Sequence, residues 1–343
     1  MGKKIAVIGA GSWGTALAVS LASAGHGVSM WTRKPEHTLA MKTDGQNKKY
    51  LPDVMFPETL TVADTMEEAI TGADVVMFST PAQGFRGVLE QALPYLTQDM
   101  VLVNVAKGIE QKSLKRLSEI AEEAIPGVKY VVLSGPSHAE EVGRLMPTTI
   151  VAAAEDLELA EYVQDIFMTE ALRIYTNTDV VGVELGGALK NIIALGAGIS
   201  DGMGFGDNAK AALMTRGMTE MSRLGVALGA SEETFAGLTG MGDLIVTCTS
   251  MHSRNRRCGI MIGEGMEPAE ATKRIGMVVE GMFTAEAAYE LANKVGVEMP
   301  ITDLGQMAAE MLLERIKGDK SPYRMVYLSP RLCVRDSVVD INK

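Results

Sequence analysis

Short apolar runs alternate with helical or loop segments through the first half of the chain. Runs of this kind are typical of a mainly parallel sheet that helices cover on both faces. Residues that follow several of the runs, such as Ser79, Lys107 and Ser137, should then meet at the carboxyl edge of the sheet, where ligands bind. Six runs have the length and composition of buried strands: Ile5 to Ile8, Val28 to Trp31, Val75 to Phe78, Val101 to Val103, Val131 to Leu133 and Thr149 to Ala152.

The pattern changes in the second half, where strand-like runs fade from about Asp179 and helical segments follow one another to about Arg315. We expect a sheet domain over residues 1–178 and an all-helical domain over residues 179–343. The most apolar of the helical segments is Val180 to Gly204. No uninterrupted apolar stretch approaches the ~18 residues of a membrane span, so we expect no membrane insertion.

A glycine motif follows the first apolar run, and a small apolar helix is expected directly after it. The motif is Gly9-x-Gly11-x-x-Gly14, and the helix is expected over Thr15 to Ala24. Gly9 permits a tight turn, Gly11 lets the backbone approach a pyrophosphate, and Gly14 lets the helix pack closely. The helix N-terminus then faces the anion with free N–H groups. With strand and helix in place, the motif predicts a dinucleotide-binding α/β fold of the Rossmann type rather than a structural turn.

The residues after the second run indicate which dinucleotide is bound. An acidic residue about 20 positions beyond the glycines usually binds the ribose hydroxyls, whereas a nearby Arg accommodates a 2′-phosphate. This chain has Arg33 and Lys34 at that place, which favours NADP(H) over NAD(H), although NADH remains an option. The alternative is a solvated basic turn, and Glu36 lies close enough to weaken the preference.

Lys190 is the most informative polar residue of the second half. It lies on the segment Val180 to Gly204, and its neighbours on the same helical face, Gly187 and Ala194, are both small. This arrangement predicts open space around the ammonium group and a lysine that lines a cavity. The alternative is a lysine on the surface.

A second ammonium group, that of Lys107, should come from the carboxyl edge of the sheet. Two ammonium groups in one site depress each other's pKa, which makes a lysine usable as an acid or base near neutral pH. The turn Gly240-Met-Gly-Asp243 ends in a carboxylate that would orient one of these lysines if it lay beside them. From spacing alone, a simple turn is the plainer interpretation.

A cluster of hydroxyl, guanidinium and amide groups precedes a later helical stretch. It consists of Ser253, Arg254 and Asn255, followed by Arg256 and Arg257. Such a set at a helix start suits a phosphate, because Arg offers two parallel hydrogen bonds and the backbone adds N–H donors. An exposed basic loop is the alternative, but anion binding is favoured in a chain this acidic.

Composition narrows the class of partner. A formal net charge of −11 over 343 residues argues against a nucleic-acid groove or an anionic membrane surface as the main partner. Three cysteines, one of them Cys333, are too few for a disulfide framework and are typical of the cytoplasm. Cys248, His252 and Cys258 lie close in sequence, but a closed zinc site needs a fourth ligand, so no metal site is expected.

Taken together, these motifs resemble the bacterial-type NAD(P)-dependent glycerol-3-phosphate dehydrogenases over roughly residues 3 to 315. The most specific part is Gly187-Ala-Leu-Lys190-Asn-Ile-Ile-Ala194, continuing through Gly198, Asp201, Gly202 and Gly206 to Asn208. Also similar are Val105-Ala-Lys107-Gly-Ile-Glu110, Gly135-Pro-Ser137-His-Ala139-Glu140, Gly240-Met-Gly-Asp243, Ser253-Arg-Asn255 and Val279-Glu280-Gly281.

The resemblance implies reversible hydride transfer between NADPH (or NADH) and dihydroxyacetone phosphate, a small phosphorylated substrate, to give sn-glycerol 3-phosphate for phospholipid synthesis. It implies Lys190 as the proton donor or acceptor. The implied cofactor contacts, beside Gly9, Gly11 and Gly14, are Ser12, Trp13, Arg33, Lys34, Lys107, Ala139, Arg254, Val278 and Glu280. The implied substrate contacts are Lys107, Gly135, Ser137, Lys190, Asp243, Ser253, Arg254 and Asn255.

One position departs from the family pattern, because the chain has Pro81-Ala82 where Pro-Ser is common. A hydroxyl contact on the cofactor side is therefore expected to be missing. Two other functions stay open at this point: a related dehydrogenase of a small hydroxy acid, and a nucleotide sensor without catalysis. The oligomeric state also stays open, with a homodimer as one option.

Overall fold

The computed structural model describes residues 2–297 of the chain, and its sheet and helices form one compact unit. The helical segments expected between residue 298 and Arg315, the segment from Lys317 onward and Cys333 lie outside the described residues. The sheet ends at Asn177 and the first long helix begins at Val180, but the expected division into two domains stays a prediction.

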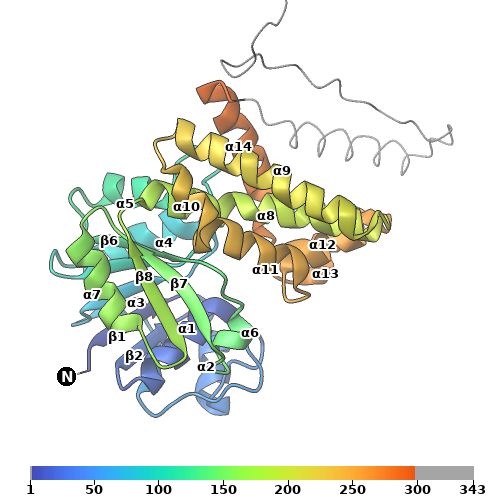
Figure 1. The fold of residues 1–343 in the computed structure, drawn as a ribbon. Helices are drawn as coiled ribbons and strands as arrows, with labels where there is room; N and C mark the ends of the chain where they lie inside the picture. Colours follow the sequence, from blue (N-terminus) through green and yellow to red (C-terminus); the bar gives the residue numbers. More distant parts are fainter. Residues whose placement is uncertain (1, 298–343) are drawn as a thin grey trace, which may run out of the picture. The chain divides into compact units, whose positions relative to one another are not determined.

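Eight strands form a single sheet in the order β3-β2-β1-β4-β5-β6-β7-β8 (Figure 1). All neighbouring strands are parallel except β6 and β7, which run antiparallel. The six predicted strands are confirmed, so the mainly parallel α/β fold follows from the apolar runs. The strands are β1 (Lys4–Ile8), β2 (Gly27–Trp31), β3 (Leu60–Val62), β4 (Val75–Phe78), β5 (Val101–Asn104), β6 (Tyr130–Ser134), β7 (Thr148–Ala153) and β8 (Leu172–Asn177).

Two strands were not predicted from the apolar runs, and both lie at the edges of the sheet. β3 has only three residues. In β8, buried and exposed positions alternate at first, so the strand lacks the continuous apolar run of a central parallel strand. An edge strand has one neighbour and needs less apolar surface, which explains the weaker signal.

Helices cover both faces of the sheet (Figure 1). Ile5 and Val7 of β1 belong to one buried cluster, whereas Ala6 and Ile8 belong to the other, as expected when successive side chains point to opposite faces. Buried residues of α1, α2, α6 and α7 join the first cluster, and those of α3, α4 and α5 join the second. The helices are α1 (Ser12–Ser23), α2 (Pro35–Asp44), α3 (Met66–Ile70), α4 (Phe85–Ala92), α5 (Leu117–Ala124), α6 (Ala139–Val142) and α7 (Leu157–Phe167).

From residue 180 to residue 297 the regular structure is helical. A π-helical turn, Leu238–Gly242, leads directly into α11, so the segment that ends in Asp243 is helical rather than a simple turn. The helices are α8 (Val180–Gly202), α9 (Gly206–Ala227), α10 (Glu232–Ala236), α11 (Asp243–Thr249), α12 (Arg254–Gly263), α13 (Pro268–Ile275) and α14 (Glu280–Val295).

α8 corrects the expected length of the apolar stretches, but not the expectation of no membrane insertion. Its 23 residues, with a mean hydropathy of 1.4 over the most apolar window, are long and apolar enough to cross a membrane by length and composition. However, 83% of that window is buried inside the structure, where α8 contacts α9, α11, α12 and α14. Its apolar character is accounted for by burial among other helices.

Glycines bring α8 and α12 unusually close together. A Cβ atom at Gly198 would lie 2.1 Å from the carbonyl oxygen of Arg256, and one at Gly202 would lie 2.3 Å from that of Ile260. On α12, a Cβ atom at Gly259 would lie 2.2 Å from the carbonyl oxygen of Leu195. Only glycine permits such contact between helix backbones. This contact holds the start of α12 beside the polar residues of α8.

Candidate active site

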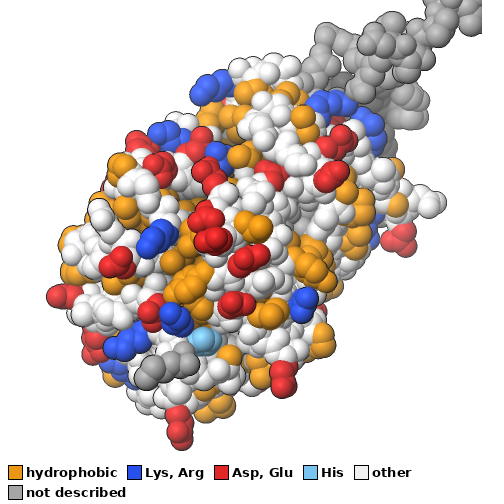
Figure 2. Space-filling model, turned by 60° about the vertical axis from the view of Figure 1, so that its left-hand side comes forward, with side chains coloured by type: hydrophobic (Ala, Val, Ile, Leu, Met, Phe, Trp, Pro, Cys, Tyr) orange, Lys and Arg blue, Asp and Glu red, His pale blue; other side chains and the backbone are white. Residues whose placement is uncertain are grey.

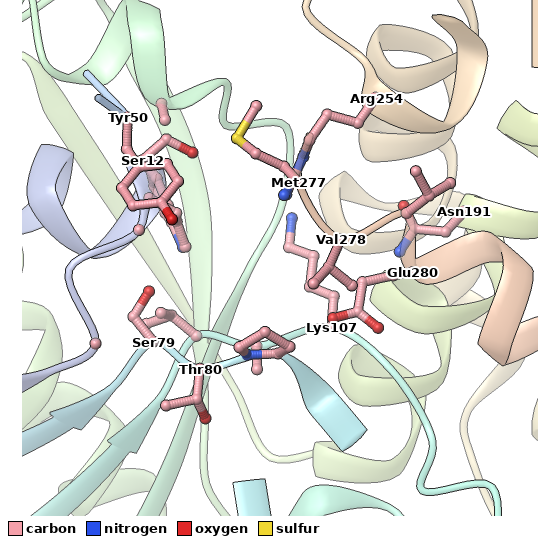
Figure 3. Close-up of a pocket in the computed structure, with 18 of the residues that line it drawn as sticks. Ser12, Tyr50, Ser79, Thr80, Lys107, Asn191, Arg254, Met277, Val278 and Glu280 are labelled. Atoms are coloured by element: carbon pink, nitrogen blue, oxygen red, sulfur yellow. The ribbon is translucent and has the colours of Figure 1, made fainter. Parts of the chain in front are cut away.

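A pocket of about 890 Å³ lies at the carboxyl ends of β1, β2, β4 and β5 (Figure 3). Its other wall consists of residues from α8, α11 and α12 and of the segment between α13 and α14. The carboxyl edge of a parallel sheet is where such folds bind ligands, so the position agrees with the prediction from the strand ends.

The glycine turn has the geometry that its sequence predicts. Gly9 has a φ of +115°, and a Cβ atom there would lie 2.5 Å from the carbonyl oxygen of Ser79. A Cβ atom at Gly14 would lie 2.2 Å from the carbonyl oxygen of Gly9, so α1 could not approach the turn with any larger residue. At Gly11, by contrast, a Cβ atom would point into open space next to the pocket.

These features fit a dinucleotide. The open position at Gly11 lets a pyrophosphate approach the backbone, and a side chain there would fill that space. α1 begins at Ser12, and no described side chain caps its N-terminus, so its first N–H groups remain for an anion. Ser12 and Trp13 line the pocket, whereas Gly14 does not.

Arg33 and Lys34 lie at the rim of the pocket, where β2 ends and α2 begins, and both are exposed. Ser79 and Thr80, which follow β4, line the pocket as the strand ends predict. Tyr50 and Met277, which no motif marked, line it as well. Figure 3 shows the Tyr50 ring beside Ser12. Tyr50 comes from a loop that reaches this wall only through tertiary contacts, so the local sequence pattern does not predict that it lines the pocket.

On the opposite wall, one carboxylate bridges two lysines. Asp243 Oδ1 lies 2.8 Å from Lys190 Nζ, and Asp243 Oδ2 lies 2.7 Å from Lys107 Nζ. Lys190 also donates to Thr247 Oγ1 at 2.7 Å. Asp243 thus orients both lysines, although its spacing in the sequence had favoured a simple turn. All four residues line the pocket.

The main cause of the shifted Lys190 pKa is burial, whereas the sequence suggested the second ammonium group, that of Lys107. Burial lowers the pKa of Lys190 to about 8; Asp243 opposes this shift, and the Lys107 ammonium adds to it as a smaller cause. Burial by itself would raise the pKa of Asp243, but the charges of Lys107 and Lys190 outweigh it, so this pKa lies below its usual value. The site therefore holds a buried carboxylate and a lysine that titrates near neutral pH.

Lys190 lines the pocket, as expected, but its ammonium group is not surrounded by open space. Its ammonium group contacts Asp243 and Thr247, and the lysine is only 6% exposed. Gly187 is small for another reason: a Cβ atom there would lie 2.7 Å from Ser134 Oγ and 3.4 Å from the stem of Lys107. The glycine allows α8 to pack against the end of β6, which brings the two lysines together.

The start of α12 forms a third part of the site. Ser253 caps α12 by accepting a hydrogen bond from the Arg256 N–H, and the side chain of Arg254 points into the pocket together with that of Lys107 (Figure 3). Burial lowers the pKa of Arg254. Arg256 instead forms an ion pair with Asp201 at 2.8 Å and does not line the pocket.

Asn255 connects three helices. Its Oδ1 accepts from the Gly281 N–H at 2.9 Å, and its Nδ2 donates to Asn191 Oδ1 at 2.9 Å. Asn191 in turn donates to the Gly187 carbonyl on α8. Asn255 lines the pocket, and these hydrogen bonds also connect α12 to α8 and α14.

The loop after β6 contributes main-chain atoms. Gly135 has a φ of +141°, and its carbonyl accepts from Lys107 Nζ at 2.9 Å and from Ser137 Oγ at 2.8 Å. Ser137 and Ala139 line the pocket, whereas Gly135 does not. Gly135 therefore supports Lys107 rather than facing the pocket.

The segment before α14 and the turn after β4 meet at the same site. Val278 and Glu280 line the pocket, and Glu280 Oε1 accepts from the Ala82 N–H at 3.1 Å. Burial raises the pKa of Glu280. Ala82 itself, in the short 3₁₀ turn Ala82–Gly84, is fully buried and is not among the pocket-lining residues. The Ala82 side chain faces the interior near Gly108, and the expected absence of a hydroxyl contact with the cofactor at this position stays a prediction.

The outer surface of the protein carries a mixture of side-chain types. On the face shown in Figure 2, acidic, basic and apolar side chains are interspersed. Cys248 and Cys258 are buried free thiols that do not line the pocket. His252 and Glu140 do line it, and His252 Nδ1 lies 3.9 Å from Glu140 Oε2.

Two family models match the chain. The model described as NAD-dependent glycerol-3-phosphate dehydrogenase N-terminus matches residues 4–160, and the model for the C-terminus of the same proteins matches residues 179–315. The two matches cover strands β1 to β7 and the helical region, including every part of the pocket described above.

Individual proteins agree with these matches. The chain is 56% identical over 306 residues to a glycerol-3-phosphate dehydrogenase [NAD(P)+] from Pelotomaculum thermopropionicum, covering 88% of each protein. It is 50% identical over 318 residues to the enzyme of that name from Clostridium perfringens, covering 93% of the chain and 95% of the relative. A crystal structure of glycerol-3-phosphate dehydrogenase from Coxiella burnetii superposes with a TM-score of 0.86 at 37% identity, covering 93% and 95% of the two chains.

Proposed function

The chain belongs to the NAD-dependent glycerol-3-phosphate dehydrogenase family, and we propose that it interconverts dihydroxyacetone phosphate and sn-glycerol 3-phosphate with Lys190 as the acid–base group. It is an NAD(P)-dependent oxidoreductase that acts on a CH–OH group. The nicotinamide of NADPH or NADH supplies the hydride when the cofactor is bound. Synthesis of glycerophospholipid precursors is the proposed use of the product.

The sheet-side wall of the pocket would hold the cofactor. The turn from Gly9 to Gly11 and the start of α1 provide N–H groups for the pyrophosphate. Arg33 and Lys34 at the rim would contact the 2′-phosphate of NADPH, which NADH lacks. The further proposed cofactor contacts are Ser12, Trp13, Lys107, Ala139, Arg254, Val278 and Glu280.

Lys190 would move the proton of the reaction. As the carbonyl carbon of dihydroxyacetone phosphate is reduced, negative charge develops on its oxygen, and an adjacent ammonium stabilises that charge and delivers a proton. A pKa of about 8 suits this task, because the ammonium form is present at neutral pH and the neutral amine is accessible for the reverse oxidation.

Asp243 and Lys107 would position this group. The carboxylate holds Lys190 Nζ at 2.8 Å on one oxygen and Lys107 Nζ at 2.7 Å on the other, so neither ammonium can swing away freely. Lys107 is also held by the Gly135 carbonyl. The second positive charge would help to stabilise the developing oxyanion and to attract the anionic substrate.

The start of α12 would bind the phosphate. Arg254 offers a guanidinium group within the pocket, and the N-terminus of α12 offers backbone N–H groups. Ser253, Asn255, Ser137 and Gly135 are the remaining proposed substrate contacts, with Gly135 acting through Lys107 and Ser137. A phosphate fixed here would set the distance between the carbonyl group and Lys190.

The observation that carries this proposal is the buried Lys107–Asp243–Lys190 bridge in the same pocket as the glycine turn. We would assay the full chain with NADPH and NADH against dihydroxyacetone phosphate and a panel of keto acids, the oxidised forms of small hydroxy acids. Turnover of the phosphate ester is expected, with NADPH preferred. No turnover of dihydroxyacetone phosphate would defeat the proposal. Reduction of a keto acid instead would favour the alternative function, a dehydrogenase of a small hydroxy acid.

Three further properties belong to the proposal. The buried free thiols of Cys248 and Cys258 support a reducing, cytoplasmic location. We propose a homodimer as the assembly, to be checked by light scattering. The division into a cofactor domain over residues 1–178 and a substrate domain from 179 onward is supported by the change from strands to helices between Asn177 and Val180.

A further inference from the structure

A buried polar cluster lies next to the glycine turn, outside the groups used above. Its centre is Asn47, which lies in the loop after α2 and is 0% exposed. Asn47 belongs to none of the motifs that mark the active site, and it does not line the main pocket. A fully buried amide that contacts several separate segments calls for an explanation, because each of its polar atoms must be satisfied.

Every polar atom of the Asn47 side chain has a partner. Nδ2 donates to the Ala10 carbonyl at 3.0 Å and to Thr15 Oγ1 at 2.8 Å. Oδ1 lies 3.0 Å from His37 Nε2 and accepts from the Tyr50 N–H at 3.3 Å. The amide therefore joins the glycine turn, α1, α2 and the loop that carries Tyr50.

The bond to Ala10 has a direct consequence for the pyrophosphate site. In a planar trans peptide, the carbonyl of one residue and the N–H of the next point in opposite directions. When Asn47 holds the Ala10 carbonyl toward the interior, the N–H of Gly11 is directed to the other side, toward the pocket that Gly11 lines. If this peptide rotated, a carbonyl oxygen would face the pyrophosphate and repel it.

The second arm of the cluster reaches the same pocket. The Tyr50 N–H donates to Asn47 Oδ1 at 3.3 Å and also to the Asn47 main-chain carbonyl at 3.2 Å. The Tyr50 ring packs edge-on against His37 with centroids 5.2 Å apart. Its ring lines the pocket beside Ser12 (Figure 3). Asn47 thus contacts both the glycine turn and the residue that carries an aromatic ring next to it.

We propose that Asn47 is a positioning residue for the dinucleotide: its side-chain amide holds the Ala10–Gly11 peptide in the arrangement that binds the cofactor, and its side chain and main chain together anchor the main chain of Tyr50. This role rests on the proposed function, because it assumes that the glycine turn binds NADPH or NADH. It places Asn47 one contact away from the cofactor, so its loss should weaken cofactor binding more than it slows the chemical step.

Asn47→Asp tests the decisive bond with little change of shape. The Thr15 hydroxyl can reverse and donate to the new carboxylate, and His37 and the Tyr50 N–H can still donate to it. Only the Ala10 carbonyl loses its donor and faces an oxygen instead. Asn293→Asp, on the exposed side of α14 and away from the pocket, makes the same chemical change as a matched control.

The measurements are the Kd for NADPH without substrate, by nicotinamide fluorescence, and kcat at saturating NADPH and dihydroxyacetone phosphate. Asn47→Asp should raise the Kd at least about tenfold, as expected for a buried carbonyl left without a partner. At saturation, kcat and the KM for dihydroxyacetone phosphate should stay within about threefold of wild type. Asn293→Asp should change none of these values.

Asn47→Ser provides a neutral second variant if the buried carboxylate prevents folding, since its hydroxyl is too short to reach Ala10. An unchanged Kd for NADPH in either folded variant would overturn the proposal, and so would a fall in kcat alone. Failure of both variants to fold would show that the amide serves the fold rather than the cofactor. Wild-type protein that binds NADPH but does not reduce dihydroxyacetone phosphate would defeat the proposed reaction while leaving this test intact.

Discussion

The two walls of the pocket present different kinds of chemical group. The sheet-side wall presents main-chain atoms and small residues, set by the glycine turn and the N-terminus of α1. The helical wall presents buried charged side chains, of which Asp243 and Lys190 are 1% and 6% exposed. A backbone cradle suits a cofactor that many enzymes share, whereas buried charges are needed to shift a pKa and move a proton.

This difference has a testable meaning: changes in the helical wall should alter the chemical step, and changes in the sheet-side wall should alter cofactor binding. The glycine contacts between α8 and α12 belong to the helical wall, because they hold the proposed phosphate-binding residues beside Lys190.

The largest effect is expected for Lys190→Ala. Removal of the general acid should lower kcat by about 10²–10⁴-fold, while the Kd for NADPH stays nearly unchanged because the sheet-side wall is intact. Lys190→Met, which keeps most of the side-chain volume, should behave in the same way. Steady-state kinetics and NADPH fluorescence measure the two quantities, and a variant that kept most of its rate would show that another group moves the proton.

A large effect is also expected for Gly198→Ala. The new Cβ would meet the Arg256 carbonyl oxygen at 2.1 Å, so α12 and its phosphate-binding start would have to move. We expect a loss of about 1–3 kcal/mol in the free energy of unfolding and up to about 100-fold in kcat/KM for dihydroxyacetone phosphate.

Gly196→Ala, two residues away on the same helix, is the matched control. There the nearest atom to a new Cβ is Leu213 Cδ2 at 3.5 Å, which is ordinary contact. The control should be as stable as wild type or more so, since alanine favours helix. Equal kinetics for the two variants would mean that the close α8–α12 contact is unimportant for the substrate.

A smaller effect, confined to the sheet-side wall, is expected for Arg33→Ala. Loss of the guanidinium should lower the ratio of kcat/KM for NADPH to that for NADH by about tenfold, because only NADPH carries the 2′-phosphate. Lys42→Ala on α2 removes an exposed charge that pairs with Asp64 at 2.6 Å and leaves the pocket lining intact. The cofactor ratio should respond to Arg33 alone, and an unchanged ratio in Arg33→Ala would argue against a 2′-phosphate site here.

The smallest effect is a change in pH dependence. With a Lys190 pKa of about 8, reduction of dihydroxyacetone phosphate should fall as pH rises above 8, because the ammonium form is lost, and oxidation of glycerol 3-phosphate should rise over the same range. Asp243 raises this pKa and Lys107 lowers it. Asp243→Asn should therefore move the pH limb downward, and Lys107→Met should move it upward. A pH limb that stays in place in both variants would mean that it does not report Lys190.

The local pattern of apolar and polar residues was sufficient to predict the elements that depend on short-range periodicity or spacing. The six central strands, the glycine turn and the long helix that carries Lys190 follow from apolar runs, glycine spacing and helical periodicity. The edge strands β3 and β8 do not follow from apolar runs, because an edge strand has less surface to bury.

The charge bridge and the Asn47 cluster were decided only by the tertiary structure. Asp243 lies 136 residues from Lys107 and 53 from Lys190, and spacing alone could not say whether it met either one. Asn47 likewise reaches Ala10 across 37 residues of sequence.

The sequence by itself determined which chemical groups are present and which local elements carry them, because these depend on neighbouring residues. Packing determined which of those groups are buried together, and burial is the main cause of the shifted Lys190 pKa. The proton-transfer chemistry proposed for this protein therefore depends on how α8, α11 and the sheet edge meet.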